Sequence, residues 1–428
     1  MTVYIVLQYF NLNRILLLIV GLWPYQRTKL VKFQLCLVFG IFVSFIPAQL
    51  TPLLTLECTV DLVIKILPPI LIVIMFAIKY MSFIINARFV KQMMEQLQHI
   101  CTNLTDENEI AIMKNYGNKT RTYTASLILY AFCNLIIFIL LPFLPKIAGI
   151  ILFINESQLH HTVYIMTEYF VDREKYFYLI LLHMDAAVCI GAIAVIGIAT
   201  MFVGYMKHAC AMFKICSYRI KHAIMLDAES VQLRDYMIHK KIKYAVDIHR
   251  KGIEFSTFVI SSFEWLFFLL IAIGVLCLSL NLFCLLQTVS SGHNVEEFIV
   301  HFSCVSIILI YMFLGNYAAQ EIIDHYNHIF ITAYNIQWYA ASIRIQKMIL
   351  FLLQRGAKAF NLNLGGLFIG SLESAGMVKE YMLYESRLFN VKYYNQRTRR
   401  KRTYFITADK YFNILFHSFI FDTAKLTS

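Results

Sequence analysis

The amino-acid sequence predicts an all-α membrane protein with seven transmembrane helices, a cytoplasmic amino terminus and long intracellular helical extensions. Hydrophobic residues make up 59% of the 428 residues and charged residues only 15%, and the mean hydropathy is +0.63. Soluble globular domains contain about 45–50% apolar and about 25% charged residues. The fold class follows from this composition, from the lengths of the apolar segments and from the positions of the basic residues between them.

Six apolar segments are each long enough to cross a bilayer, which requires about 20 residues of helix. A seventh, at about 364–383, is apolar up to Val378 except for Ser371, Glu373 and Ser374, and this polar stripe favours contact with a partner helix or a water-filled path. The six long segments are 33–54, 62–85, 123–144, 178–205, 258–289 and 298–319.

The basic residues between the spans predict the orientation. Arg14, Arg27, Lys29 and Lys32 precede the first span, while the link from the first to the second span has no Lys or Arg. The link from the fourth to the fifth span carries ten, and the link from the fifth to the sixth has none. Because cytoplasmic loops are enriched in Lys and Arg, the amino terminus is predicted to be cytoplasmic. The net charge of +12 is then mostly loop charge, and no nucleic-acid-binding motif accompanies it.

Three cytoplasmic segments are predicted to be helical. Residues 88–121 and 206–252 mix apolar and charged residues at helical spacing, which predicts extensions of the membrane helices into the cytoplasm. Residues 334–355 predict an amphipathic helix that precedes the last span.

No cofactor, metal site or enzymatic activity is expected. Of the ten cysteines only Cys58 clearly falls in a predicted outside loop, so no extracellular disulfide framework is expected. The adjacent His160 and His161 do not have the spacing of a zinc site. The sequence contains no nucleotide-binding loop, GxSxG or HExxH motif.

The segment 333–379 contains several motifs in a fixed order. Trp338-Tyr339, Gln346-Lys347 and the run 351–355 are followed by Gly365-Gly366-Leu367-Phe368 and Ser371-Leu372-Glu373. Residues 13–34 and 206–224 add two upstream segments. Together these motifs resemble the insect odorant receptor family, in particular the receptors of ants, bees and wasps.

The resemblance implies an odorant receptor subunit in the plasma membrane of olfactory sensory neurons. Such a subunit binds small volatile ligands and, with a co-receptor in a heterotetramer, forms an odorant-gated non-selective cation channel. The seven-helix domain would cover residues 1–379, and the last span would line the pore. The pore-helix residues implied by this match are Gly366, Phe368, Ser371 and Glu373.

The resemblance also implies that the cytoplasmic helices meet those of other subunits. Ordinary packing within one subunit is an equal alternative for the residues concerned. The implied assembly residues are Trp338, Tyr339, Gln346, Lys347 and Leu353.

A pocket for a volatile odorant should be a dehydrated cavity with aliphatic and aromatic walls and one or two polar groups. The outer halves of the second, third, fourth and sixth spans supply such side chains. Lys65, Lys79 and Glu264 also interrupt apolar spans, and at their shallow positions snorkelling or an aqueous vestibule reduces the cost of a charged group. Glu264 is interpreted as a helix-end or assembly residue. The predicted ligand-binding residues are Ile66, Phe138, Phe143, Tyr178, His183, Met184, Asp185, His301 and Val305.

Residues 380–428 depart from the family pattern. The resemblance predicts a short end outside the cell, whereas Lys379, Glu380 and Glu385 interrupt the last span and residues 397–402 are strongly basic. We interpret this tail as foreign to the fold, with a divergent but genuine ending as the alternative. A disrupted pore helix would make the chain a receptor variant that does not conduct.

Two other classes share some of these features. A secondary transporter would favour internal repeats, broken mid-membrane helices and buried charge pairs, and the sequence shows no convincing repeat. A gustatory receptor would share the topology but normally ends in a Thr-Tyr and Gln-Phe signature, which does not occur near the end of this chain.

Glycosylation tests the predicted orientation. Sequons occur at Asn103, Asn118 and Asn155, and only Asn155 is predicted to lie outside the cell. In insect cells, Asn155→Gln is expected to abolish any gel shift that an endoglycosidase removes, while Asn103→Gln and Asn118→Gln leave mobility unchanged. A glycan on Asn103 or Asn118 would contradict the orientation.

Overall fold

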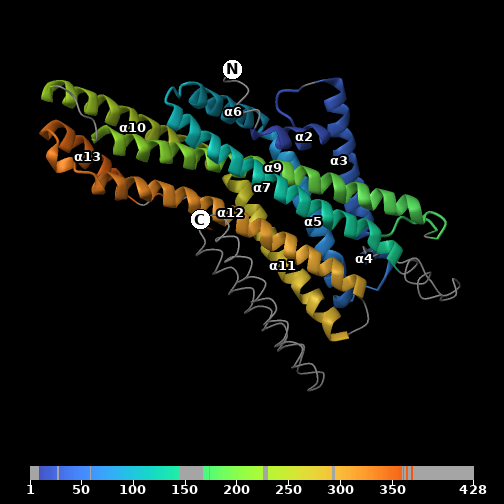
Figure 1. Ribbon diagram of the computed structural model, residues 1–428. Coiled ribbons are helices and arrows are strands. Elements are labelled where there is room, and N and C mark those ends of the chain that lie inside the picture. Colours follow the sequence, from blue (N-terminus) through green and yellow to red (C-terminus); the bar gives the residue numbers. More distant parts are fainter. Residues whose placement is uncertain are drawn as a thin grey trace.

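The computed structural model describes residues 9–26, 28–57, 59–144, 167–172, 174–224, 230–291, 295–358, 360, 363–364 and 368–369, and these are almost entirely helical (Figure 1). Six of the helices in this part of the chain are long and apolar enough to cross a membrane, which confirms the predicted all-α class. In chain order the elements are α2 (Asn11–Ile19), α3 (Lys29–Leu50), α4 (Pro52–Thr55), α5 (Val60–Ile85), α6 (Ala87–Thr102), α7 (Glu107–Leu140), the 3-10 turn η1 (Leu141–Phe143), α9 (Phe177–Ile224), α10 (Val231–Ser261), α11 (Glu264–Ser291), α12 (Val295–Asn335), the 3-10 turn η3 (Trp338–Ala340), α13 (Ile343–Gly356), and the two-residue strands β1 (Asn363–Leu364) and β2 (Phe368–Ile369).

The fifth apolar helix begins later than predicted. The sequence pattern predicts a span from residue 258, but α10 continues to Ser261 and α11 begins at Glu264. The hydroxyls of Ser261 and Ser262 both donate hydrogen bonds to the carbonyl oxygen of Phe258, over 3.3 and 2.7 Å. Serine hydroxyls that bond the preceding turn destabilise and bend helices, and an acidic residue in the first turn suits a new helix.

The amphipathic segment 334–355 is divided into two helices. α12 continues to Asn335, and α13 begins only at Ile343, after the turn η3. The side-chain amide of Gln346 donates to the carbonyl oxygens of Tyr339 (3.0 Å) and Ala341 (2.9 Å). These bonds satisfy backbone acceptors that the break leaves without helical partners.

Most of the predicted seventh span, 364–383, lies outside the described residues. Leu364, Phe368 and Ile369 are described, and they are extended rather than helical: β1 and β2 pair antiparallel, with Leu364 opposite Phe368. Gly365 and Gly366 follow Leu364 in the sequence, and glycine has low helix propensity, which explains why a helix does not begin at Leu364.

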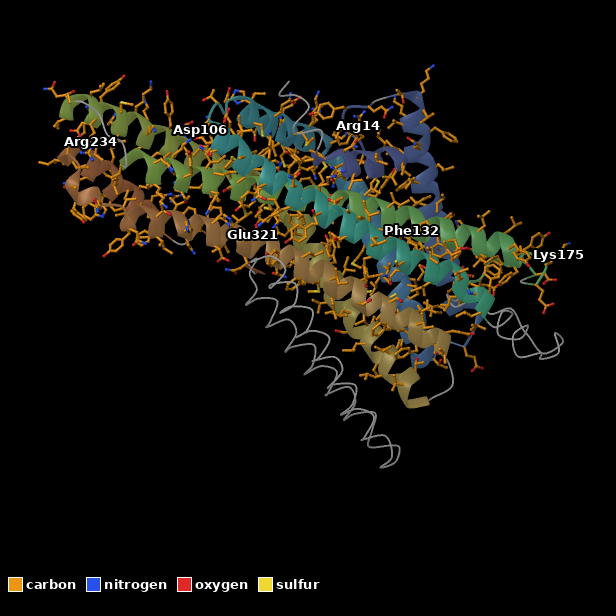
Figure 2. All side chains as sticks on the ribbon, in the orientation of Figure 1. Arg14, Asp106, Phe132, Lys175, Arg234 and Glu321 are labelled. Carbon is orange, nitrogen blue, oxygen red and sulfur yellow. The ribbon has the colours of Figure 1, made fainter. Side chains whose placement is uncertain are left out.

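α9 is the central helix of the fold. Its 48 residues extend over about 72 Å, more than twice the roughly 30 Å of a hydrocarbon core. Lys175, just before α9, and Arg234 on α10 accordingly lie at opposite ends of the molecule (Figure 2). The helices packed against α9 are α2, α3, α5, α7, α10 and α12.

Glycines on α9 allow this close packing. A Cβ added at Gly191 would lie 2.0 Å from the ring of Phe76 on α5, and one at Gly204 would lie 2.6 Å from the ring of Phe10. Small residues at helix contacts let backbones approach closely. In a membrane the hydrophobic effect does not drive helices together, so this close packing is a main source of their association. α2 is fixed to the same helix by a buried hydrogen bond of 2.6 Å from Asn13 to Thr200.

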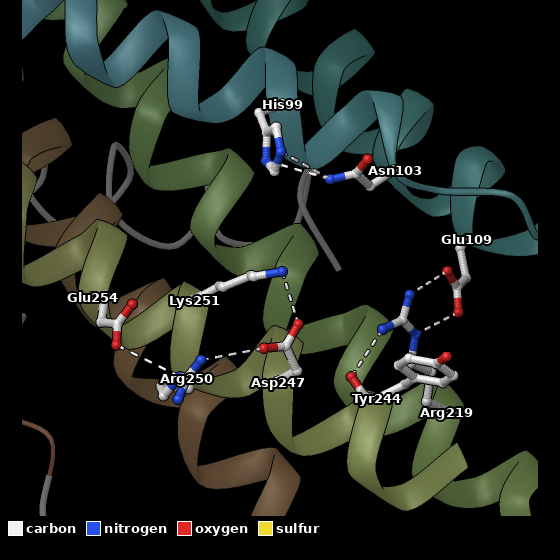
Figure 3. A network of polar contacts seen from close by, with 9 residues as sticks. All are labelled: His99, Asn103, Glu109, Arg219, Tyr244, Asp247, Arg250, Lys251 and Glu254. Atoms are coloured by element: carbon white, nitrogen blue, oxygen red, sulfur yellow. Dashed lines mark hydrogen bonds and ion pairs between the residues drawn. The ribbon is translucent and has the colours of Figure 1, made fainter. Parts of the chain in front are cut away.

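The part of the molecule that the charge pattern assigns to the cytoplasm has a core like that of a soluble protein. We call it the cytoplasmic bundle: α6, α10, α13, the start of α7 and the ends of α9 and α12. Arg219 on α9 makes two hydrogen bonds to the Glu109 carboxylate, of 2.6 and 2.7 Å, and a third to the Tyr244 carbonyl oxygen (Figure 3). The Arg219 side chain is 19% exposed and that of Glu109 only 8%.

His249 is buried in the same bundle. Its ring packs on Phe213 of α9 and Tyr326 of α12, and its Nε2 has no hydrogen-bond partner among the described residues. Burial, together with the positive charge of Arg355 on α13, lowers the pKa of His249 to about 4. The ring is therefore neutral in the folded protein at physiological pH.

The Arg219–Glu109 pair is expected to stabilise the cytoplasmic bundle only as long as both partners are present. Arg219→Met leaves a buried carboxylate without its partner, and breaking a buried pair costs about 3–5 kcal/mol. A lower melting temperature of the purified receptor in detergent checks this, and Arg219→Met/Glu109→Leu should recover much of the loss. Lys91→Met removes an exposed pair with Glu95 and should cost less than about 1 kcal/mol.

Stability is expected to fall as the pH drops from about 6.5 to about 4. An unfolded histidine takes up a proton below its ordinary pKa of about 6.5, whereas His249 in the folded protein stays neutral down to about 4. The unfolded state therefore binds more protons in this window. By pH 4 the free energy of unfolding is expected to be lower by roughly 3 kcal/mol. Melting temperatures of the native protein and His249→Gln across this range should differ in slope; identical slopes would contradict the prediction.

Candidate functional site

The described residues enclose a cavity of about 920 Å³ with the character of a ligand site, which we call the five-helix cavity. Its walls come from α5, α7, α9, α11 and α12, and Gln49 of α3, Leu141 of η1 and Ile260 of α10 also line it. Most of the lining side chains are aliphatic or aromatic, among them Ile72, Phe76, Leu135 and Phe267. This volume lies in the usual range for small-molecule pockets of about 300–1,000 Å³.

Glycine makes room on one wall of the five-helix cavity. Gly274 of α11 is buried, yet a Cβ added there would meet no atom within 4 Å. A buried backbone that faces empty space faces a cavity. Larger residues at this position would occupy the space that a ligand needs.

The end of the cavity predicted to face outward contains polar groups that pair with one another. The Nδ1 atom of His301 lies 3.1 Å from the side-chain oxygen of Asn281. Lys65 and Glu297 form an ion pair of 3.4 Å. Here the cation Lys65 already has a carboxylate partner.

A hydrogen bond beside the cavity joins α7 and α12. The hydroxyls of Tyr130 and Ser306 lie 2.8 Å apart, and the Asn134 amide donates to the Tyr130 carbonyl oxygen over 2.8 Å. Asn134 and Tyr130 both line the cavity. These groups can orient a ligand that carries a hydroxyl or carbonyl group.

Two further lining residues are buried polar groups without such partners. Gln49 is fully buried, and neither of its side-chain polar atoms has a hydrogen-bond partner in the described part of the chain. Lys79 is 6% exposed, and its Nζ lies 3.4 Å from the centre of the Tyr311 ring. Of the two alternatives for Lys79, snorkelling is not what the structure shows, because the ammonium group is held over an aromatic face at the cavity.

Two of the nine residues predicted to bind ligand, Phe138 and His301, line the five-helix cavity. His183 lies nearer α3: its Nε2 is 3.0 Å from Ser44 and its Nδ1 is 2.8 Å from the Tyr169 hydroxyl, so both ring nitrogens are engaged. Tyr178 is 64% exposed. The predicted residues that do not line the cavity are Ile66, Phe143, Tyr178, His183, Met184, Asp185 and Val305.

Of the predicted assembly residues, Tyr339 lies at an exposed apolar surface, whereas Trp338 and Leu353 are half-buried and pack against the core of the same chain. Tyr339 is 68% exposed, and the neighbouring Ile343 and Phe351 are 70% and 71% exposed. The opposite face of α13 is buried through Ile345, Ile349 and Leu352. The residues predicted for assembly are Trp338 and Tyr339 in η3, and Gln346, Lys347 and Leu353 in α13.

The pore-helix residues are described only at Phe368, whose backbone is part of β2. Gly366, Ser371 and Glu373, together with the tail 380–428, lie outside the described residues. The same is true of Asn155, of Cys58 and of the pair His160-His161.

One side-chain cluster in the described residues has the composition of a metal site. The ligand atoms of Cys210, Glu321 and His325 lie within 4.8 Å of one another, and Figure 2 shows Glu321 on α12 near the middle of the molecule. Lys207 already pairs with the Glu321 carboxylate, and the Tyr116 hydroxyl contacts His325 Nε2. A metal cation would have to displace both, so this arrangement favours a polar network over a metal site.

Several polar residues of the cavity were not predicted from the sequence, namely Gln49, Tyr130, Asn134 and Asn281. Their common signal is a polar side chain within an apolar span, which in membranes usually faces the helix bundle or a cavity. Sequence alone does not distinguish such residues from polar side chains that bond within their own helix.

The comparisons with known proteins agree on the class of fold. Two solved structures of the insect olfactory receptor OR5 from Machilis hrabei are similar to this chain. The structure in complex with eugenol has 16% sequence identity and a TM-score of 0.70, and the match covers 90% of this chain and 96% of the receptor. The other has 17% identity and a TM-score of 0.72 over 89% and 97% of the two chains. No protein of curated function matches the sequence.

The family assignment comes from the sequence itself. The family model described as 7tm Odorant receptor matches residues 59–377, which include the five-helix cavity apart from Gln49, and α13. Six apolar helices of sufficient length agree with a multi-pass membrane protein. With its fold, its cavity and a match over most of its length, this chain belongs to the 7tm odorant receptor family.

Proposed function

We propose that this chain is an odorant receptor subunit that binds small, mostly apolar volatile ligands in the five-helix cavity. The observation that carries the proposal is the cavity itself, about 920 Å³ of space among apolar side chains with a few polar groups. Buried apolar surface supplies most of the affinity for such a ligand, and the polar groups orient it. The related receptor in complex with eugenol supports a ligand of this kind.

The ligand acts by shifting an equilibrium. With a co-receptor in a heterotetramer, the subunit forms a non-selective cation channel in the plasma membrane of olfactory sensory neurons, and odorant favours the open state. A ligand shifts the equilibrium only by its preference for one state, and a tenfold preference corresponds to about 1.4 kcal/mol per site. Movement of α11 or α12 relative to α5 would change the cavity and link its occupancy to the gate.

The exposed apolar surface of η3 and α13 supports subunit assembly through the cytoplasmic bundle. Tyr339, Ile343 and Phe351 are all about 70% exposed. Contiguous exposed apolar residues next to a well-packed helix favour a protein interface. The predicted assembly residues Trp338, Gln346, Lys347 and Leu353 belong to the same two elements.

Filling the five-helix cavity is expected to abolish or strongly reduce the odorant response. Gly274→Leu adds a side chain where an added Cβ meets nothing within 4 Å, and it raises helix propensity by about 1 kcal/mol, so folding should be preserved. The measurement is odorant-evoked current in cells that express the chain with the insect co-receptor. Residues after Lys379 are tested both as given and replaced by a family-type ending.

Gly40→Leu is the matched control. Gly40 lies in α3, also has open space around a Cβ, and is exposed rather than part of the cavity. It should leave the current unchanged. Equal responses of Gly274→Leu and the native chain would contradict the proposed site, and flux of a labelled substrate without channel current would favour a transporter.

A further inference from the structure

Lys79 is a cation in the five-helix cavity for which the described residues supply no counterion. It lies on α5 and is 6% exposed. The ammonium group contacts the face of the Tyr311 ring at 3.4 Å, and no carboxylate of the described residues lies within the 4.0 Å of an ion pair. By contrast, Lys65 and Lys207 pair with Glu297 and Glu321.

An aromatic face alone compensates poorly for the loss of water around a cation. Lysine is almost never fully buried unless paired, and a buried charge requires hydrogen-bonded partners. Lys79 does not use its long side chain to reach solvent, because its ammonium group is held against Tyr311. Since Lys79 and Tyr311 both line the cavity, the missing partner can come from a ligand.

The shape and lining of the cavity indicate what kind of molecule would carry the anionic group that pairs with Lys79. Its lining residues on α5 run from Lys65 to Lys79, 14 residues and therefore about 21 Å along the helix axis. Between these ends the α5 lining is apolar: Pro69, Ile72, Val73, Met75 and Phe76. An elongated hydrocarbon with an anionic group at one end matches this distribution.

We propose that Lys79 determines ligand class, and that the five-helix cavity prefers aliphatic monocarboxylic acids over neutral odorants of equal length. The carboxylate accepts hydrogen bonds from the Lys79 ammonium group, and the chain extends along α5 toward Asn281 and His301. A neutral alcohol or ester fills the same space but leaves the cation without an anion. This inference rests on the proposed function, since it requires that the cavity be the ligand site.

Binding to the purified full-length receptor in nanodiscs tests the inference independently of channel gating. Decanoic acid, decan-1-ol and methyl decanoate serve as probes of matched length. The acid is expected to bind at least about tenfold more tightly than the other two, the factor for a hydrogen bond to a charged group. Lys79→Met should remove this preference by weakening the acid alone, whereas Lys79→Arg should retain it.

The controls separate the two proposals. Gly274→Leu should weaken all three probes, and size-exclusion profiles and melting temperatures verify that each variant folds. If the alcohol and ester bind and depend on Gly274 but the acid has no advantage, or if Lys79→Met leaves the acid unaffected, the inference about Lys79 is wrong while the site stands. If none of the probes binds, both proposals fail.

Discussion

The continuous helix α9 is the element on which the rest of this structure depends. At 48 residues it is too long for a bilayer alone, and its glycines allow Phe76 of α5 and Phe10 to lie against its backbone. Because α5, α7 and α12 all pack on it, its position fixes the geometry of the space between them. The same helix then continues into the cytoplasmic bundle, so the apolar helices and this bundle share one continuous helix.

The two halves of the molecule are stabilised by different physical terms. The cytoplasmic bundle uses an apolar core, a buried ion pair between Arg219 and Glu109 and an aromatic cluster around His249. In the apolar half, water-driven burial cannot hold helices together, so close backbone approach and short polar bridges such as Tyr130–Ser306 take its place. The polar side chains of that half include pairs that bridge neighbouring helices, such as His301–Asn281 and Lys65–Glu297.

The five-helix cavity results from the way the helices of the apolar half pack against one another. The helices are in close contact where glycines allow it. Where a residue has no side chain and the neighbouring helix does not approach, as at Gly274, space remains between them. At the outer end of the cavity His301 pairs with Asn281 and Lys65 with Glu297, whereas Lys79 has no carboxylate partner among the described residues. Because Lys65 and Lys79 lie at opposite ends of the α5 lining and only Lys65 has a carboxylate partner, a ligand with one anionic end would bind with that end at Lys79.

The sequence by itself determined the all-α class, the six apolar helices and the family, because hydropathy over about 20 residues and ordered motifs are local properties. It also pointed to Phe138 and His301 of the cavity. It could not predict that His183 and Tyr178 lie away from the cavity, that Lys79 lies over Tyr311, or that segment 334–355 divides at η3. Those outcomes depend on helix rotation and on contacts between residues far apart in the chain, such as Lys79 and Tyr311, which only the tertiary structure decides.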